Sequence, residues 1–408
     1  MDFYKYLLDE NKWNEFLLSK TESFYISKKD EKTFNDYINN KKYLPIVTKI
    51  INDDFEFSIP KKIAMDKIGK KKKRIVYKFN KHESILLKYI NFLTYEYDYL
   101  FSPNLYSFRK NKSVKDAIHK IQKIHDLNNM YAYKVDISNY FNSIPISNLL
   151  EKLEIEIDYN LYKLFKTLLT PKHVIYQKNI IEEEKGIMAG VAVSAFLSNF
   201  YLKEMDNYFF SNNIAYFRYA DDIIVFSNSY EELLSHKKII FDFLTSNKLF
   251  VNENKEYFFN PGDAIDFLGF SIQNNEIDLC SSQVKKIKLK IKRTSNKLRK
   301  WKIGKNVGDI PTLYVMNKIF NTKFYGIKND ELSWKYWFFP IITTTKSLHE
   351  IDLYMQECER YIITGVHNKK NYEKVPYKML KRSYYKSLVH EYYAFHNYKK
   401  NKENTAKC

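Results

Sequence analysis

Two adjacent aspartates interrupt an otherwise apolar, β-prone stretch, and this feature most restricts how the chain can fold. The stretch reads Phe-Arg-Tyr-Ala-Asp-Asp-Ile-Ile-Val-Phe over residues 217–226. Side chains alternate along a strand, so Asp221 and Asp222 can serve one site only if the chain turns there. An acidic turn without function is the plain alternative, because Asp is common in turns. The apolar flanks and the lack of glycine favour a functional site at a hairpin tip.

A second lone carboxylate, Asp136, stands at the end of another short β-prone run, residues 131–135. It could instead cap a helix, a role that Ser138 or Asn139 could take equally well. If Asp136 and Asp221 end neighbouring strands, their carboxylates converge despite the long separation in sequence. Such carboxylates can hold two hard divalent cations about 3.5–4 Å apart, one activating a hydroxyl and one steadying a leaving phosphate. The nine histidines are scattered, so no His or Cys cluster competes as a transition-metal site.

The charge balance and the aromatic content point to a nucleic-acid partner. Lys and Arg number 67 against 48 Asp and Glu, a net charge of +19, and the cations cluster most densely at 70–74 and 284–293. Lysine and arginine neutralise phosphates, and aromatic rings, 17% of this chain, stack on bases. An AT-rich genome, which enriches Lys, Asn, Ile, Tyr and Phe without any function, explains the composition equally well. The 45% hydrophobic content excludes a disordered basic tail.

The three cysteines, Cys280, Cys358 and Cys408, are isolated, so the sequence predicts neither a zinc site nor a disulfide framework and fits a reducing compartment. The longest apolar run, residues 189–197, falls short of the roughly 20 residues that span a bilayer. We therefore expect a soluble, cytoplasmic protein with no membrane partner.

Hydrophobic periodicity predicts an α+β organisation with an antiparallel sheet. Helices are expected within 1–50, at 83–100, 113–125, 147–170, 189–204 and 233–247, and through most of the chain beyond 281. Strands are expected at 55–60 and 75–79, forming a ribbon around a basic turn, and at 131–135, 214–226, 250–251 and 267–272.

Five motifs in a fixed order resemble those of reverse transcriptases. They are Asp136 with Phe141, Gly186–Ser194 with Asn199, Tyr219–Asp222, Lys255, and Phe267–Phe270. Upstream, Arg74-Ile-Val-Tyr and Leu105–Arg109 resemble finger motifs of bacterial reverse transcriptases. The resemblance covers roughly residues 55–275 and implies a right-hand polymerase. The implied parts are an N-terminal helical segment (1–50), fingers (51–130), a palm (131–280, with finger elements near 160–188) and a helical thumb with a C-terminal extension (281–408).

The resemblance also assigns catalytic roles. Asp136 and Asp221 would bind two Mg²⁺ ions, with Asp222 as a weaker ligand and the carbonyl of Ile137 completing one shell. Lys255 would act as a general acid toward pyrophosphate, although an exposed strand lysine is an equally good interpretation.

The implied nucleotide site is formed by five further residues. Lys73 and Arg74 would contact the triphosphate, unless they belong to a solvated basic turn. Phe141 would exclude a ribose 2′-OH and so select dNTPs, and Gly190 and Ala189 would lie beside the nucleotide. Template and primer contacts would come from Arg109, Gly186, Phe267, Leu268 and Gly269, together with Ser194 and Asn199, which would also pack the helix that follows.

Departures from the family pattern restrict the subgroup. Ala189 stands where related enzymes often have Gln, Ala195 stands where a Pro is common, and the Val-Thr-Gly tripeptide typical of retron enzymes is missing. The chain looks most like the bacterial defence-associated, abortive-infection reverse transcriptases. That likeness implies an RNA template, which could be a dedicated non-coding RNA, a DNA product, dNTP substrates and synthesis that could be protein-primed; homo-oligomerisation stays open. A retron-like or group II intron-like enzyme and a non-catalytic RNA-binding scaffold are the alternatives.

Overall fold

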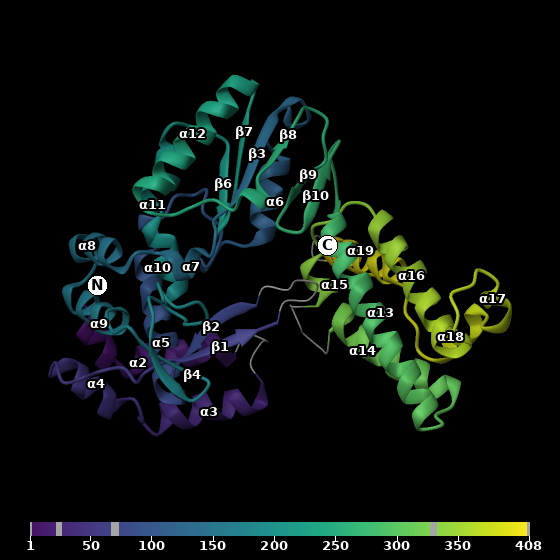
Figure 1. Cartoon of the computed structure of the whole chain (residues 1–408), viewed down its shortest axis with the longest axis horizontal. Helices are drawn as coiled ribbons and strands as arrows, with labels where there is room; N and C mark the ends of the chain where they lie inside the picture. Colours follow the sequence, from purple (N-terminus) through teal and green to yellow (C-terminus); the bar gives the residue numbers. More distant parts are fainter. Residues whose placement is uncertain (1, 22–26, 67–72, 327–332, 406–408) are drawn as a thin grey trace. The chain divides into compact units, whose positions relative to one another are not determined.

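The computed structural model describes residues 2–21, 27–66, 73–326 and 333–405, and the chain divides into two compact units, Met1–Asp263 and Ala264–Cys408 (Figure 1). Lys70–Lys72, the start of the predicted basic turn, lie outside the described residues. Both units mix helices and strands, which confirms the predicted α+β class.

A four-stranded antiparallel sheet forms the centre of the N-terminal unit, in the strand order β6-β7-β3-β8. Its strands are β3 (Tyr131–Asp136), β6 (Tyr216–Tyr219), β7 (Asp222–Ser227) and β8 (Tyr257–Phe259). Their β-branched and aromatic residues suit a pleated surface, and β3 and β7 are buried on both faces. Helix α12 (Tyr230–Ser246) packs on β3 and β7, and α11 (Lys203–Ser211) packs on β6 (Figure 1). The predicted antiparallel sheet is confirmed.

A second sheet has the order β2-β1-β4-β5. It consists of β1 (Lys61–Met65), β2 (Arg74–Lys78), β4 (His173–Tyr176) and β5 (Asn179–Glu182). The prediction of a strand at 55–60 was wrong: the strand begins at Lys61, after Pro60. The carbonyl of Pro60 accepts a hydrogen bond from Ile175 N (2.9 Å), and the Glu83 carboxylate accepts one from Ser58 N. These bonds take up backbone groups of residues 55–60 that a strand would use to pair with a neighbouring strand.

The N-terminal helices are α1 (Phe3–Leu8), α2 (Glu10–Thr21), α3 (Lys28–Asn39) and α4 (Leu44–Ile51), as the periodicity predicted. They pack around Trp13, which is fully buried. Its ring stacks on Tyr43 (4.2 Å between centroids) and on Tyr89 (3.6 Å), which belongs to α5 (Lys81–Leu93). Aromatic stacking therefore joins this segment to the rest of the unit.

The remaining helical elements of the unit carry or support the site described below. They are η1 (Thr94–Leu100), α6 (Val114–Gln122), η2 (Leu127–Asn129), α7 (Tyr140–Ser143), α8 (Ile146–Glu156), α9 (Tyr159–Leu169), α10 (Ser194–Tyr201) and η3 (Glu253–Lys255). The predicted helices at 83–100, 113–125, 147–170 and 189–204 are confirmed in location, although breaks divide three of them. The predicted strand at 250–251 is reduced to a single bridge between Ile137 and Val251.

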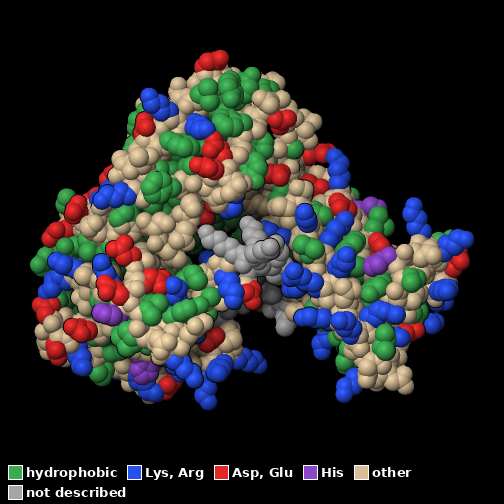
Figure 2. Space-filling model, viewed as in Figure 1, with side chains coloured by type: hydrophobic (Ala, Val, Ile, Leu, Met, Phe, Trp, Pro, Cys, Tyr) green, Lys and Arg blue, Asp and Glu red, His purple; other side chains and the backbone are tan. Residues whose placement is uncertain are grey.

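The C-terminal unit joins a small antiparallel sheet to a group of helices. The sheet contains β9 (Ile265–Phe267), β10 (Phe270–Gln273) and β11 (Glu276–Leu279). The helices are α13 (Ser281–Gly304), α14 (Asp309–Tyr325), α15 (Trp334–Trp337), α16 (Lys346–Thr364), α17 (Asn371–Lys374), α18 (Tyr377–Arg382) and α19 (Leu388–Thr405). Figure 2 shows Lys and Arg side chains gathered on this unit, over the lysine-rich α13.

Residues 267–272 do not form the single strand that the sequence suggested. Leu268 and Gly269 both have positive φ angles, 51° and 92°, and make a turn between β9 and β10. The three strands belong to the C-terminal unit, which begins at Ala264, whereas the sequence analysis grouped them with the palm. A Cβ on Gly269 would lie 2.8 Å from the Gln283 side chain, so the turn packs against the start of α13.

Within the described ranges, none of the helices is both long and apolar enough to span a membrane.

Candidate active site

A cavity of about 540 Å³ in the N-terminal unit collects most of the residues to which the sequence assigned catalysis and nucleotide binding. It lies where the last residue of β3 and the turn before β7 meet the start of β2 and the segment before α10. Its wall includes Lys73, Arg74, Asp136, Ile137, Phe141, Ala189, Asp221 and Lys255.

The carboxylates converge because of the strand register. Asp136, the last residue of β3, pairs with Asp222, the first residue of β7. Directly opposed residues of an antiparallel pair project to the same face of a sheet. The Ile137 amide donates to the Asp221 carbonyl (3.0 Å), and this bond holds the aspartate turn against the end of β3. Residues far apart in sequence thus bring three acids together.

This convergence has an electrostatic cost. The pKa of Asp221 is raised to about 6, first by burial and then by repulsion from Asp222 and Asp136. Asp136 is 5% exposed and forms an ion pair with Lys255, which follows the bridge at Val251. Burial acts to lower the pKa of Lys255, but the bond to Asp136 and the nearby carboxylates outweigh burial and raise it. Lys255 therefore keeps its proton and partly compensates the crowded acids.

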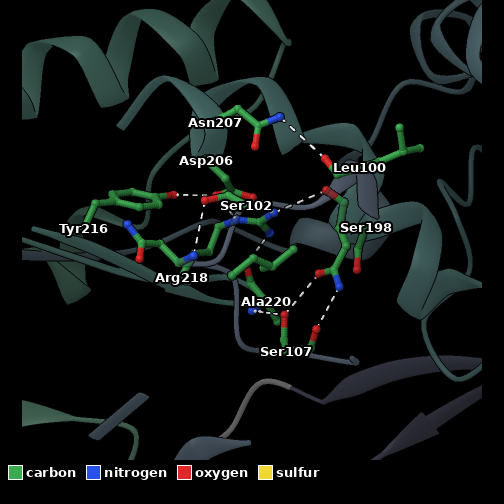
Figure 3. A network of polar contacts seen from close by, with 12 residues as sticks. Leu100, Ser102, Ser107, Ser198, Asp206, Asn207, Tyr216, Arg218 and Ala220 are labelled. Carbon is green, nitrogen blue, oxygen red and sulfur yellow. Dashed lines mark hydrogen bonds and ion pairs between the residues drawn. The ribbon is translucent and has the colours of Figure 1, made fainter. Parts of the chain in front are cut away.

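The tip of the aspartate turn is fixed by hydrogen bonds from other elements (Figure 3). Ala220 has a φ of 56°, in the left-handed region that non-glycine residues seldom occupy. Its amide donates to Ser107 Oγ (2.9 Å), and that hydroxyl donates to Asn199 Oδ1 (3.0 Å). The Ala220 carbonyl accepts from Arg218 Nη1 (3.1 Å). Both polar groups of the strained residue are thereby satisfied, and the turn is held in place.

A buried ion pair, which the sequence analysis did not identify, lies directly under this turn. The guanidinium of Arg218 donates from Nε to Asp206 Oδ1 (2.7 Å) and from Nη2 to Asp206 Oδ2 (2.5 Å), and both side chains are completely buried. The Tyr216 hydroxyl donates to the same carboxylate (2.9 Å), and its pKa is raised by burial. Figure 3 shows the three side chains pointing toward one another. The sequence feature that could have predicted this ion pair is the position of Arg218, an arginine within an otherwise apolar strand.

Gly186 supports the loop that carries Phe141, and its assignment to template contact stays a prediction. A Cβ on Gly186 would lie 2.5 Å from the Phe141 carbonyl oxygen, and that oxygen accepts from Ile187 N (2.9 Å). Phe141 lines the cavity, and its ring packs edge-on against Phe108, with centroids 6.0 Å apart. The requirement for glycine here is therefore a close approach of two backbone segments within the protein.

The segment around Ala189 is clamped on both sides. Its carbonyl accepts from Tyr77 N of β2 (2.8 Å), and its amide donates to Asn142 Oδ1 (3.2 Å). Gly190, with a φ of 97°, approaches the Tyr77 carbonyl so closely that an added Cβ would lie 3.2 Å from it. Ala189 thus lines the cavity at a fixed distance from β2.

Two basic residues stand at the other side of the cavity. Arg74 opens β2, and Lys73 precedes it; both side chains are exposed. Lys73 lies 3.8 Å from Asp66 in a solvent-exposed pair, an arrangement worth little energy. Their cationic groups are available to an anionic ligand, and their assignment to a triphosphate remains a prediction.

Three residues assigned to template or primer have structural partners instead. Arg109 donates hydrogen bonds to both carboxylate oxygens of Asp98 (2.7 Å each) and to the carbonyls of Ser102 and Leu105. Its guanidinium therefore links Asp98 to the backbone at 102–105. Ser194 and Asn199 are fully buried, which prevents contact with a nucleic acid. The Ser194 hydroxyl donates to backbone carbonyls that precede α10, and Asn199 binds Ser107. Phe267, Leu268 and Gly269 belong to the C-terminal unit, where they form the β9–β10 hairpin.

The donor chemistry of the cavity suits a hard divalent cation. Asp136 and Asp221 supply carboxylate oxygens, the ligands that Mg²⁺ prefers, and their mutual repulsion would be relieved by a bound cation. Across the parts of the chain that the structure describes, no group of three or more His, Cys, Asp or Glu side chains is arranged to hold a metal ion. In the observed arrangement an oxygen of Asp136 is paired with Lys255.

Comparisons with known proteins identify the family. Residues 59–272, just over half of the chain, match the model of the reverse transcriptase (RNA-dependent DNA polymerase) family. No curated protein matches the sequence. Among solved structures, telomerase from Candida albicans in complex with a fragment of telomeric RNA is similar at 13% identity and a TM-score of 0.44, over 85% of this chain and 69% of that one. Apo telomerase from Candida tropicalis, truncated from its C-terminal domain, is similar at 12% identity and a TM-score of 0.42, over 55% of each chain. By the family match, the chain belongs to the reverse transcriptases, the RNA-dependent DNA polymerases.

Proposed function

We propose that this reverse transcriptase adds dNTPs to a DNA end in the cavity that contains Asp136 and Asp221, with Mg²⁺ as the cation. The observation that carries the proposal is the convergence of these carboxylates in a cavity that Lys73 and Arg74 also line. An acidic centre beside a basic edge matches a reaction between a hydroxyl and a triphosphate. When bound, Mg²⁺ would lower the pKa of the attacking hydroxyl and offset charge on the leaving phosphate.

The residues of the chain have separate tasks in this reaction. Lys73 and Arg74 would attract and orient the triphosphate. Asp136 and Asp221, fixed by the register of β3 with β7 and by the bond between Ile137 and Asp221, would hold the cations. Lys255 retains its proton at neutral pH, since its pKa is raised, and a proton held there could pass to the departing pyrophosphate.

The test of catalysis compares three proteins in a primer-extension reaction with an RNA template, dNTPs and Mg²⁺. Asp221→Asn keeps the size of the side chain and removes its charge, so we expect synthesis to be abolished. Asp242→Asn, an exposed position on α12, should retain the wild-type rate. Synthesis by Asp221→Asn at the wild-type rate would refute the assignment of the cavity.

A non-catalytic RNA-binding scaffold is the second candidate function, and the site disfavours it. Clustered carboxylates repel phosphate, so a binding protein has no use for Asp136, Asp221 and Asp222 at one point. Analysis of the nucleic acid that copurifies from cells separates the two candidates: RNA alone favours a scaffold, and DNA with RNA favours the polymerase.

We further propose a role in bacterial anti-phage defence in the cytoplasm, on the basis of the sequence resemblance alone. In that role the template is a dedicated non-coding RNA, or synthesis starts from a protein hydroxyl. Phage plaque counts on bacteria that express the wild-type protein should fall, and Asp221→Asn should restore them. Equal protection by both proteins would show that defence does not require DNA synthesis. A retron-like or group II intron-like enzyme is instead indicated if the copurifying RNA folds as a branched template or as an intron.

A further inference from the structure

A second cavity, of about 700 Å³, lies in the N-terminal unit and shares no lining residue with the catalytic cavity. Its walls are the segment 56–60, one face of α9, the turn into β4, and Lys185, and we call it the Lys185 cavity. Lys185 follows directly on Glu183 and Glu184, which line the catalytic cavity, so one short segment borders both spaces.

One face of α9 supplies most of the polar groups in this cavity. Tyr159, Lys163, Lys166, Thr167 and Thr170 all line it, and their spacing places them on the same side of the helix. The face therefore presents two ammonium groups, the hydroxyl of Thr170 and an aromatic ring, whereas the Thr167 hydroxyl donates to the Lys163 carbonyl (3.1 Å). Lys163 is paired with Asp53 (2.6 Å), whereas Lys166 has no ion-pair partner within the described ranges.

The opposite wall is held in place before any ligand arrives. Glu83 is almost completely buried, and its carboxylate accepts from the Ser58 amide (2.7 Å) and the Ser58 hydroxyl (2.5 Å). The Pro60 carbonyl is bound by Ile175 N (2.9 Å). The segment 56–60 is thus tied to α5 on one side and to β4 on the other.

Lys185 is the most buried cation of the cavity, with only 3% of the residue exposed. Among the residues that the structure describes, no acceptor forms a hydrogen bond or an ion pair with its ammonium group. The nearby carboxylate of Glu183 already accepts from Lys62 and from the Tyr77 hydroxyl. Burial lowers the pKa of Lys185 to about 8. Lys185 lines the cavity and is largely buried, so its ammonium is only partly hydrated, and a ligand that supplies an acceptor there is favoured.

We infer that the Lys185 cavity binds a phosphate group, carried either by a free nucleotide or by a single-stranded RNA, with Lys185 and Lys166 as its charged contacts. Phosphate oxygens accept charge-assisted hydrogen bonds from several donors at once, and ammonium groups beside the hydroxyl of Thr170 suit this geometry. The exposed ring of Tyr159 offers a surface on which a base can stack. Glu56 is the single acidic residue on the wall. This inference is independent of DNA synthesis.

The first test measures binding by the full chain in EDTA, which withholds divalent cations and prevents catalysis. The probes are ATP and a 12-nucleotide single-stranded RNA, and the variant is Lys185→Met, which keeps the length of the side chain without its charge. We expect at least one probe to bind Lys185→Met about tenfold more weakly, and the probe that responds identifies the source of the phosphate. Lys172→Met, an exposed neighbour outside the cavity, should bind both probes as the wild type does. Unchanged binding of both probes by a folded Lys185→Met protein would overturn the inference.

A second measurement uses the wild-type chain and therefore does not depend on the folding of a variant. Reductive methylation of lysines at pH 8, mapped by mass spectrometry, should modify Lys185, because its lowered pKa leaves much of the amine neutral at that pH. Saturating ATP or RNA should protect it, and exposed Lys172 should remain modified. If Lys185 is modified to the same extent with and without each probe, the cavity does not bind phosphate.

Discussion

Substitution of a buried glutamate in the C-terminal unit should stabilise the protein. Glu359, on α16, is completely buried, and neither of its carboxylate oxygens has a hydrogen-bond partner. Burial raises its pKa from 4.5 to about 8, although Asn317 and Arg360 act in the opposite direction. The folded protein therefore takes up a proton at this group at neutral pH, and Glu359→Gln replaces the protonated acid with a neutral side chain of the same shape.

The magnitude and its sign follow from linkage between folding and protonation. Because the pKa is higher in the folded state, Glu359 leaves stability unaffected below pH 4.5, and stability falls as the pH rises toward about 8. One pKa unit corresponds to about 1.4 kcal/mol, so the cost at pH 7 is on the order of 3 kcal/mol, and at pH 5 it is below about 1 kcal/mol. Glu359→Gln should remove this cost at each pH, so the gain in the free energy of unfolding should grow as the pH rises.

The assay is chemical unfolding between pH 5 and pH 8, followed by tryptophan fluorescence. Three of the four tryptophans, Trp301, Trp334 and Trp337, lie in the C-terminal unit, so the signal reports mainly on that unit. Glu357→Gln is the matched control, because Glu357 lies on the same helix with about half of its side chain exposed. We expect the control to change the free energy of unfolding by less than about 0.5 kcal/mol. A gain for Glu359→Gln that is absent at pH 7, or equal at pH 5 and pH 7, would refute the reasoning.

Two further predictions concern the active site. Phe141→Ala should increase incorporation of rNTPs relative to dNTPs by at least tenfold in primer extension with an RNA template, because a bulky residue that lines the cavity is truncated; an unchanged ratio would exclude Phe141 as the gate. Arg218→Met should lower the free energy of unfolding of the N-terminal unit by about 3–5 kcal/mol, because Asp206 is left buried and charged without its partner. The double variant Arg218→Met with Asp206→Leu should regain most of that loss in urea unfolding. If it does not, the unpaired Asp206 charge is not the cause of the lost stability.

Local sequence patterns were sufficient to predict the acidic hairpin. Strand alternation requires a turn at Asp221 and Asp222 if both serve one site, and the β-prone residues on each side indicate β6 and β7 without reference to distant contacts. The same local rule located Asp136 at the end of β3. Motif order then supplied the family, since the spacing of the motifs is a property of the sequence alone.

Residues whose roles depend on distant partners were harder to interpret. Arg109 was expected to contact nucleic acid, but its position beside Asp98 commits its guanidinium to the protein. Ser194 and Asn199 belong to a recognised motif, and only the packing of α10 reveals that both are buried. A charged or polar side chain has the same appearance in a sequence whether water, a ligand or a buried carboxylate lies next to it.

The sequence by itself determined the fold class, the family and the residues at the tips of β3 and β7, because each depends on short-range periodicity or on linear motif order. Tertiary structure alone decided the partner of each buried polar group. Asp206 meets Arg218 beneath the aspartate turn, Gly186 meets the backbone at Phe141, and Lys185 is buried at the edge of a cavity. The physical reason is that burial and the distance between charges set the energy of a polar group, and both are fixed only when separate segments pack together.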